Sequence, residues 1–571
     1  MTDQLTLSSP EPLPAVRGAL PSPAVPTSSR AALSGMVAAA AALGVGELLA
    51  GLVRGIPSPL SAVGTAAIDF APSGSKEIVI SLFGTNDKAA LLILVGAIVL
   101  AAGAGIGLIA RRNLTLAGLL VVALVAVGGL ASLRDPTAIG PLVVVASALQ
   151  AGVGLQVLVM LLAAARPAAG VVATGGAVAL GSQRAEPIAP RAASPERRTF
   201  LLQAGVIGAL AVVGGVVGRS LLSGRAAAQA NATVGGGTGT GPTGSAGSGT
   251  GKVTIPQAVD PAPTLGPDAS LSIAGITPLV IPNDQFYKID TAFFPPAIDV
   301  ATWNLRVFGK VDKEVRLSFT ELVQLPLIER YVTIACVSNE VGGNLVGNAK
   351  WTGVRLTDVL DMVGVHADAT QIVPRSVDGW TAGFPTAWVT DKAHPRDAMI
   401  AVKMNDQPLP VDHGFPARLI VPGLYGYVSA TKWLTEIELT TLEAIDAYWV
   451  PRGWAKEAPI LTQSRIDVPQ TGLRVPAGPV AVAGVAWAPD RGISKVEVRV
   501  DQGPWQTATL ATEISATTWV QWKWTWQATD LGTHIIEVRA TDGTGAVQTD
   551  QTTPPDPDGA RGHHKIQVEI Q

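Results

Sequence analysis

Five long apolar runs at the start of this chain constrain its fold more than any other feature of the sequence. Each reaches the roughly 20 residues that an α-helix needs to cross the core of a bilayer. We expect transmembrane helices at Ala31–Val53, Ala89–Ala110, Leu114–Leu133, Thr137–Ala165 and Thr199–Gly218. All 13 Trp, all five Tyr and all six His lie beyond residue 280. The chain therefore combines a helical membrane region with a soluble, aromatic-rich region.

The placement of arginine predicts the orientation of these helices, because cytoplasmic loops carry an excess of basic residues. Arginines lie before the first helix, between the second and third, and before the fifth: Arg17, Arg30, Arg111, Arg112, Arg191, Arg197 and Arg198. The N-terminus is therefore expected in the cytoplasm and everything after Arg219 outside it. The segment Glu196-Arg-Arg-Thr-Phe-Leu-Leu202 also resembles a twin-arginine export signal, although paired arginines serve equally as topology anchors.

Glu47 is the only formal charge inside the five runs. An ionisable residue within a membrane is a candidate functional site by default. Glu47 follows Gly46 and lies near Arg54 at the end of its helix, which argues against an ion-path role. A single internal charge in five helices offers little ion pathway, which argues against a transporter.

Composition divides the chain into five parts. We expect a cytoplasmic tail at 1–30, the membrane region at 31–222 and a linker rich in Gly, Ser, Thr and Pro at 223–270. An α+β domain is predicted at 271–455 and an all-β sandwich at 456–571. The net charge of −3 and the lack of a basic aromatic patch argue against nucleic acid as a partner.

Local patterns place the first elements of the α+β domain. Residues 302–308 and 331–337 alternate like strands, and 356–363 has the spacing of a short amphipathic helix. Ser318 with Glu321 three residues later predicts a capping box at the start of another helix. Elements of the two types are interleaved without a strict β-α-β order, which favours an α+β fold.

Cys336 is the only cysteine, so it cannot form a disulfide within the chain. A lone cysteine is often a small buried hydrophobe on a strand. The alternative is a single soft thiolate ligand for a metal. The pattern predicts that Cys336 lies at the end of the strand that begins near Tyr331.

The residues around 404–434 carry a family resemblance. They include Asn405-Asp-Gln-Pro-Leu-Pro410, His413-Gly-Phe-Pro-Ala-Arg418, Val421-Pro-Gly423 and Lys432-Trp433. With Cys336 followed by Trp351-Thr-Gly-Val-Arg-Leu356, this order of blocks resembles the sulfite oxidase family of molybdopterin enzymes, over about residues 275–571. The resemblance implies that Cys336 binds molybdenum and is the catalytic residue.

The same resemblance implies a set of residues that bind the molybdopterin cofactor. Arg418 can fork onto phosphate oxygens, Lys432 can supply a point charge, and His413 can contact the pterin or its phosphate. The resemblance also implies cofactor contacts from a loop near residue 285, namely Asn283, Phe286, Tyr287 and Lys288. Thr386 is carried over from the bacterial branch of the family.

Two departures from the family bear on the substrate and the electrons. Sulfite oxidases follow the cysteine with arginines that hold an anion, whereas this chain has Glu340. A neutral or cationic substrate is then expected, unless cavity residues from elsewhere compensate. We find no haem domain, no histidine in the five helices for a haem and no second cysteine for an iron–sulfur cluster, so a separate electron carrier is expected.

The final segment resembles the immunoglobulin-like dimerisation domain of this family, which implies a possible homodimer. Strand-like alternation occurs at 480–487, 493–500 and 532–540. Trp522, Trp524 and Trp526 share one face by their period of two, near Trp519. We expect core packing for these rings, with an interface as the alternative.

The sequence thus predicts a multi-pass cell-membrane protein whose catalytic domain lies outside the cytoplasm. Its expected activity is the transfer of an oxygen atom to or from a small molecule by a molybdopterin oxidoreductase. The alternative is a surface binding or assembly protein that keeps the fold without the catalysis. The pattern leaves open the substrate, the direction of the reaction and the electron partner.

Overall fold

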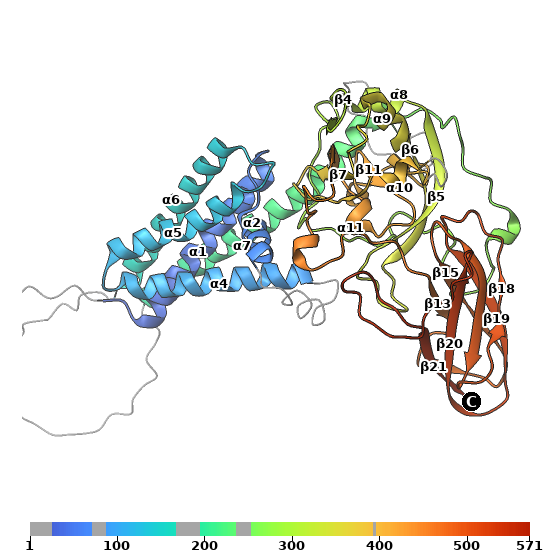
Figure 1. The fold of residues 1–571 in the computed structure, drawn as a ribbon. Helices are drawn as coiled ribbons and strands as arrows, with labels where there is room; N and C mark the ends of the chain where they lie inside the picture. Colours follow the sequence, from blue (N-terminus) through green and yellow to red (C-terminus); the bar gives the residue numbers. More distant parts are fainter. Residues whose placement is uncertain (1–24, 71–86, 167–194, 236–252, 392–395) are drawn as a thin grey trace, which may run out of the picture. The chain divides into compact units, whose positions relative to one another are not determined.

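The computed structural model describes residues 25–70, 87–166, 195–235, 253–391 and 396–571 (Figure 1). Arg17 and Arg191, as well as residues 236–252 of the predicted linker, lie outside these ranges. The chain forms two compact units. The first holds the described residues up to Gly46 and those of Ile93–Val127 and Val145–Gly215. The second holds those of Glu47–Leu92, Gly128–Val144 and Val216–Gln571.

Five helices in the described residues are long and apolar enough to cross a membrane, as predicted. They are α1 (Ser28–Leu52), α4 (Asp87–Ala110), α5 (Leu114–Ser132), α6 (Gly140–Ala164) and α7 (Pro195–Thr233). In α4, α5 and α7, large apolar side chains face outward, and Ile93, Leu119 and Leu210 are more than half exposed. Apolar side chains on the outside suit a lipid environment rather than water.

Small residues let two of these helices approach each other closely. A Cβ atom added to Gly107 on α4 would collide with the backbone of Ala31 on α1, and one added to Gly35 on α1 would collide with Gly103 on α4. Small residues at such a contact are typical of helix pairs in membranes, where packing rather than the hydrophobic effect drives association.

Two helical features differ from the prediction. The fifth helix was expected to end at Gly218, but α7 continues to Thr233, because the small and polar residues beyond Gly218 include good helix formers such as alanine. The helix α2 (Pro59–Phe70) was not predicted; it has 12 residues and is too short to span a bilayer.

Glu47 explains how α2 begins. Its buried carboxylate accepts hydrogen bonds from the hydroxyl of Ser58, at 2.8 and 2.9 Å, and from the backbone N–H of Leu60, at 3.1 Å. Nε of Arg219 lies 3.7 Å from the same carboxylate. The first N–H groups of a helix lack partners within the helix and favour negative charge. The described contacts therefore give Glu47 a structural role.

The middle domain, residues 253–455, is built on two five-stranded sheets. The first has the order β10 (Gln407–Pro408), β9 (Met399–Met404), β6 (Val346–Arg355) and β5 (Leu327–Ala335), with β11 (Arg418–Ile420) also paired to β9. The second has the order β4 (Val315–Ser318), β3 (Asn304–Gly309), β12 (Leu434–Thr440), β7 (Gln371–Ser376) and β8 (Phe384–Pro385). Only the β3–β12 pair in these sheets is parallel.

Short helices complete this domain: α8 (Phe319–Gln324), α9 (Leu356–Val363), α10 (Ala387–Thr390), α11 (Gly426–Ser429), and the 3₁₀ turns η2 (Pro267–Ala269), η3 (Val411–His413) and η4 (Val450–Arg452). The predicted capping box is present, because Ser318 and Glu321 satisfy each other's backbone N–H groups at the start of α8. The α+β prediction for this part of the chain is confirmed.

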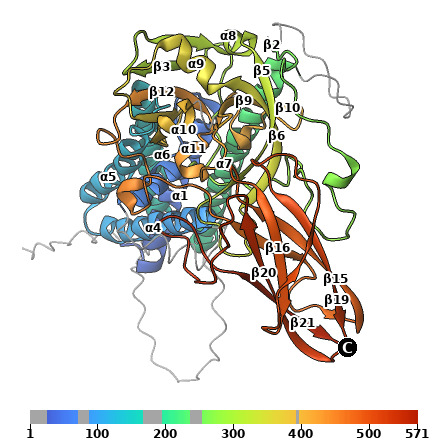
Figure 2. The ribbon, with the colours of Figure 1, turned by 45° about the vertical axis from the view of Figure 1, so that its right-hand side comes forward.

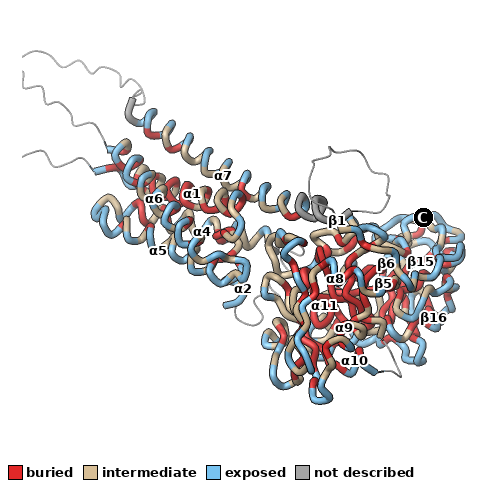
Figure 3. The backbone as a smooth tube through the Cα atoms, turned by 90° about the horizontal axis from the view of Figure 1, so that it is seen from above, coloured by how far each residue is buried: buried red, intermediate tan, exposed pale blue. Residues whose placement is uncertain are grey.

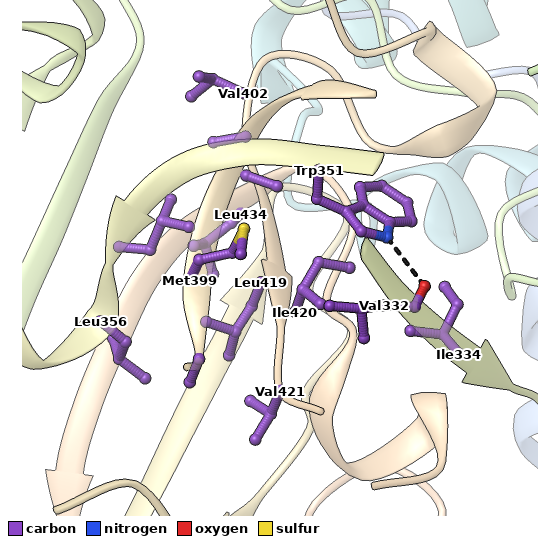
Figure 4. Packing of buried hydrophobic residues seen from close by; sticks show 14 of the residues in the cluster. Val332, Ile334, Trp351, Leu356, Met399, Val402, Leu419, Ile420, Val421 and Leu434 are labelled. Atoms are coloured by element: carbon purple, nitrogen blue, oxygen red, sulfur yellow. Dashed lines mark hydrogen bonds between the residues drawn. The ribbon is translucent and has the colours of Figure 1, made fainter. Parts of the chain in front are cut away.

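Buried residues, red in Figure 3, gather inside the middle domain, and Figure 4 shows part of this core from close by. Trp351 on β6 is fully buried, and its Nε1 donates to the backbone oxygen of Val332 on β5 at 3.3 Å. Met399, Leu419 and Leu434 fill the same core from three other strands. Since truncating a buried tryptophan costs about 3–5 kcal/mol, this packing holds the strand ends in place.

The domain begins earlier than residue 271, the boundary that composition predicted. After β1 (Val234–Gly235), the chain pairs β2 (Val253–Thr254) with it. Asp260 then accepts hydrogen bonds from Arg330, at 2.7 Å, and from Arg355, at 2.6 Å. Ile255 and Ala269 join the core of the middle domain. Residues 253–270 are therefore part of this domain.

The C-terminal sandwich, residues 456–571, packs two sheets over one apolar core (Figure 2). One has the order β13 (Gln463–Val468), β15 (Gly478–Trp487), β19 (Val520–Ala528) and β18 (Thr509–Leu510). The other has the order β14 (Arg474–Val475), β21 (His564–Ile570), β20 (Gly532–Asp542), β16 (Ile493–Val500) and β17 (Gln506–Thr507). The predicted all-β sandwich is confirmed.

The tryptophans of β19 divide between two cores. Trp522 is fully buried in the sandwich, and Trp524 and Trp526 pack against the same core, as the period of two predicted. Trp519 instead belongs to the core of the middle domain, where its Nε1 donates to the backbone oxygen of Leu279 at 2.8 Å. This ring therefore fastens the sandwich to the middle domain.

Candidate active site

A cavity of about 140 Å³ opens in the middle domain beside the end of β5. Its lining combines one thiol with cations, carboxylates and aromatic rings. These residues include Cys336, Arg418, Lys432, Arg452, Asp290, Asp378, Tyr287, Trp380, Tyr427, Trp433, Trp449 and Trp454. Such a combination of apolar walls and a few converging polar groups is typical of a ligand site.

The strand β5 delivers Cys336 to this cavity. β5 pairs with β6 along its whole length as far as Ala335, and the backbone N–H of Cys336 then donates to the oxygen of Leu345 at 2.9 Å. The thiol is buried, which raises its pKa, while hydrogen bonds from Ser338 act in the opposite direction. A thiolate at this position therefore requires a positive partner, such as a soft metal ion.

His413 lies next to the cavity with one ring nitrogen engaged. Its Nε2 donates to the backbone oxygen of Asn283 at 2.7 Å, and its ring meets that of Phe286 edge to face at 5.7 Å. Burial lowers the pKa of His413 to about 4, so the ring is neutral at pH 7. Because Nε2 carries the hydrogen, Nδ1 is left as an acceptor inside the protein.

Arg418 and Lys432 bring positive charge into the buried part of the site. Burial lowers the pKa of Arg418 to about 10 and that of Lys432 to about 8. The Nζ of Lys432 donates to Asp290 at 2.9 Å and to the backbone oxygen of Asp412 at 2.7 Å. The next residue, Trp433, has a φ of 51°, an uncommon backbone conformation that often marks a functional site.

Two aromatic residues connect this cluster to Cys336. Phe286 is buried and stacks on Tyr287 with ring centroids 5.1 Å apart. Tyr287 lines the cavity, and burial raises the pKa of its hydroxyl, so it remains protonated. A Cβ atom on Gly347 would collide with the ring of Phe286, which shows why β6 needs a glycine at this position.

The other residues predicted from the sequence lie farther from the cavity. Asn283 does not line it, but holds His413 through its backbone oxygen. Lys288 forms an exposed ion pair with Asp412 at 2.6 Å. Thr386 is buried beside α10, its backbone N–H bonded to Thr370, and it also lies outside the lining.

The structure adds to the prediction about charge near Cys336. Glu340 is exposed and does not line the cavity. The lining instead includes Arg452, whose guanidinium stacks on Tyr448 at 3.8 Å. Arg452 is thus a cavity residue from elsewhere in the chain, the alternative that the sequence left open.

Sequence reasoning missed several further residues of the lining. Asp290 and Asp378 bring carboxylates, and burial raises the pKa of Asp378. Tyr427, Trp454 and Trp449 form one wall, in which the ring centroid of Trp454 lies 5.8 Å from that of Tyr427 and 6.3 Å from that of Trp449. The clustering of tryptophans beyond residue 448 was the available signal for this wall.

The described residues fit an anionic ligand rich in hydrogen-bonding groups. Several buried polar atoms in and around the described site lack a hydrogen-bond partner, among them Nδ1 of His413, Nε of Arg418, Oγ1 of Thr431 and Oγ of Ser376. Buried polar atoms are normally satisfied, so they indicate a missing partner. Together with the thiol of Cys336, they suit a cofactor that combines a phosphate, a polar ring system and a soft metal.

Comparisons with known proteins agree with this chemistry. The family model described as the oxidoreductase molybdopterin binding domain matches residues 292–449. The uncharacterized oxidoreductase YuiH of Bacillus subtilis (strain 168) is 33% identical over 170 residues, which cover 30% of this chain and 81% of YuiH. Mitochondrial sulfite oxidase of Rattus norvegicus is 30% identical over 311 residues, which cover 45% of this chain.

The chain spans 55% of the length of the rat protein. Among solved structures, the sulfane dehydrogenase SoxCD from Paracoccus pantotrophus is 22% identical with a TM-score of 0.45. That likeness covers 54% of this chain and 86% of the other.

Proposed function

Because the chain belongs to the sulfite oxidase family of molybdopterin-binding oxidoreductases, we propose that it is a membrane-anchored enzyme that transfers an oxygen atom to or from a small substrate. The catalytic domain would lie outside the cytoplasm, and electrons would pass to or from a separate carrier. The five apolar helices support the anchor, and the placement of arginine supports the orientation.

The observation that carries this proposal is the buried thiol of Cys336 in one cavity with buried cations. The chemistry supplied by a bound molybdenum cofactor is two-electron oxygen-atom transfer. Cys336 would be the protein ligand to the metal, and the protein would contribute binding, orientation and a cavity shielded from water. A binding module without catalysis has no evident use for a buried thiol beside buried cations.

The surrounding residues would divide the work of holding the cofactor. Arg418 would donate to phosphate oxygens through its free Nε, and Lys432 would add a second charge. The unpartnered Nδ1 of His413 would accept a hydrogen bond, and Thr431 would offer its hydroxyl. Asn283 would fix the ring of His413, while Phe286 supports it from one side.

The wall of the cavity indicates the kind of substrate. Tyr427, Trp449 and Trp454 favour an apolar group, and they keep water from the reacting atoms. Arg452 can hold an oxygen that carries partial or full negative charge. We therefore propose a small organic compound with an oxidised or oxidisable sulfur or nitrogen atom. Roles for Lys288 and Thr386 would be indirect, since neither lines the cavity.

Metal analysis of the full chain tests this function. The protein, purified in detergent from a host that makes the cofactor, should contain about one molybdenum per chain. Partial reduction should give a Mo(V) signal in electron paramagnetic resonance, and Cys336→Ser should alter or abolish it. Protein from a host that lacks cofactor synthesis is the matched control. If wild type from the competent host holds no molybdenum, the chain is instead a surface binding protein with this fold.

A further inference from the structure

Lys88, at the start of the membrane helix α4, reaches a residue of the cavity. Its Nζ lies 2.7 Å from Oδ1 of Asp290 and 2.6 Å from the backbone oxygen of Ala292. The other carboxylate oxygen, Oδ2, accepts from Lys432 at 2.9 Å. Lys88, Asp290 and Lys432 all belong to the same compact unit. One carboxylate is therefore shared between a membrane helix and a residue proposed to bind the cofactor.

The charges of this cluster can be counted from the described contacts. Lys88, Arg418 and Lys432 are cations and Asp290 is an anion, since the two lysines hold the pKa of Asp290 below its usual range in spite of burial. His413 is neutral because burial lowers its pKa. Among these groups positive charge exceeds negative charge, and removal of Lys88 would reduce the positive charge by one.

This excess of positive charge suits the phosphate of the proposed cofactor. A phosphate monoester carries a charge of about −1.5 to −2 at pH 7. Lys88 therefore adds positive charge near the place where such a group would bind. Without Lys88, Asp290 would have Lys432 as its remaining lysine partner. The phosphate and the carboxylate of Asp290 would then compete for the charge of Lys432. Like charges at such distances disfavour binding.

Other charged groups lie near this cluster. Lys288 and Asp412 form an ion pair at 2.6 Å. Asp378 also lines the cavity and interacts with Asp290, and burial raises the pKa of Asp378. Arg452 pairs with Asp69 on α2 at 2.9 Å, which is a second contact between a helix of the N-terminal region and a residue of the cavity lining.

We propose that Lys88 is a positioning residue for the cofactor: by sharing Asp290 with Lys432 it compensates part of the charge of that carboxylate and leaves more of the charge of Lys432 for the phosphate, so that α4 helps to retain the cofactor. This inference rests on the proposed function. It gives the membrane region a part in the active site in addition to its part as an anchor. Lys88 would act through Asp290, without contact to the substrate.

The test is the retention of cofactor by the full-length Lys88→Met variant. We expect the variant to lose bound pterin and molybdenum about tenfold faster than wild type on dilution, as loss of one charge-assisted interaction predicts. Pterin is measured as the fluorescent product released by oxidation, which does not depend on turnover. Lys88→Arg should restore retention, and Lys310→Met, which breaks a surface ion pair with Asp368, is the matched control.

A double mutant distinguishes positioning from simple support of the fold. In an Asp290→Asn background, no carboxylate at this position competes with the phosphate for Lys432. Adding Lys88→Met should therefore change the retention of cofactor little. Equal losses caused by Lys88→Met in both backgrounds, or wild-type retention by the single variant, would overturn the inference. Absence of cofactor from wild type would instead refute the proposed function, so the two failures give different results.

Discussion

Replacing Arg418 with methionine should stabilise the protein without cofactor and weaken its hold on the cofactor. The side chain is buried, with 5% of its surface exposed, and it forms no ion pair with any carboxylate in the described part of the chain. Methionine has a similar length, fits an apolar environment and carries no charge. The two effects have opposite signs because the charge is costly in the empty site and useful in the loaded one.

The size of the first effect follows from the pKa. Burial lowers the pKa of Arg418 from 12.5 to about 10, which corresponds to about 3 kcal/mol against the charged form. The guanidinium is charged in both folded and unfolded chains at pH 7, so the folded state bears this whole cost below pH 10. The substitution also removes the 3.3 Å hydrogen bond to the oxygen of His413 and the contact with Trp351, and these losses destabilise the protein by about 1–2 kcal/mol. The net stabilisation is about 1–2 kcal/mol, a rise of about 2–8 °C in Tm.

Thermal unfolding followed by tryptophan fluorescence measures this change. All 13 tryptophans lie beyond residue 280, so the signal reports on the soluble region of the full-length protein in detergent. The samples come from a host without cofactor synthesis, with Arg306→Met on β3 as the matched surface control. In a host that makes the cofactor, Arg418→Met should retain at least tenfold less molybdenum, about 1.4 kcal/mol or more. A lower Tm for the cofactor-free variant would refute the reasoning, because Arg418 would then be a structural residue.

Three further changes test other parts of the structure. Ser58→Ala should lower the Tm by leaving the buried carboxylate of Glu47 without its hydroxyl donor, a loss of about 1.5–3 kcal/mol, whereas an unchanged Tm would mean that water replaces the hydroxyl. Gly107→Leu should disrupt the close approach of α4 to Gly35 on α1 and reduce the yield of monodisperse protein in size-exclusion chromatography, while normal yield would contradict that packing. Trp522→Ala should destabilise the sandwich by about 3–5 kcal/mol in denaturant unfolding, and a loss below 1 kcal/mol would argue against its place in the core.

The sequence predicted the long elements well because their physical signals are local. An apolar run of 20 residues has few alternatives to a membrane helix, and alternation over eight residues is difficult to satisfy except in a strand. The helix α2 was missed because its start depends on Glu47, 12 residues before Pro59, and such a cap leaves no local pattern. The early start of the middle domain was missed for a similar reason, since Asp260 is held by arginines 70 and 95 residues away.

Parts of the candidate site could be predicted from motifs, and parts could not. Cys336, Tyr287, Arg418 and Lys432 were proposed from the sequence and line one cavity in the structure. Arg452 was not proposed, because it lies outside the conspicuous motifs and enters the cavity only through the path of the chain after β12. Position relative to a motif does not report where a side chain points.

Glu340 and Arg452 show why this matters for function. Glu340 is four residues from Cys336 along the chain, yet the turn after β5 directs it into solvent, where its charge is screened. Arg452 is 116 residues from Cys336 and shares its cavity. The field that a substrate meets is set by groups in the low-dielectric cavity, so the acid next to the cysteine does not exclude an anionic oxygen. The cations that face the cavity also depend on carboxylates outside the motifs, Asp69 for Arg452 and Asp290 for Lys432, so changes in those partners can alter the site while every motif remains intact.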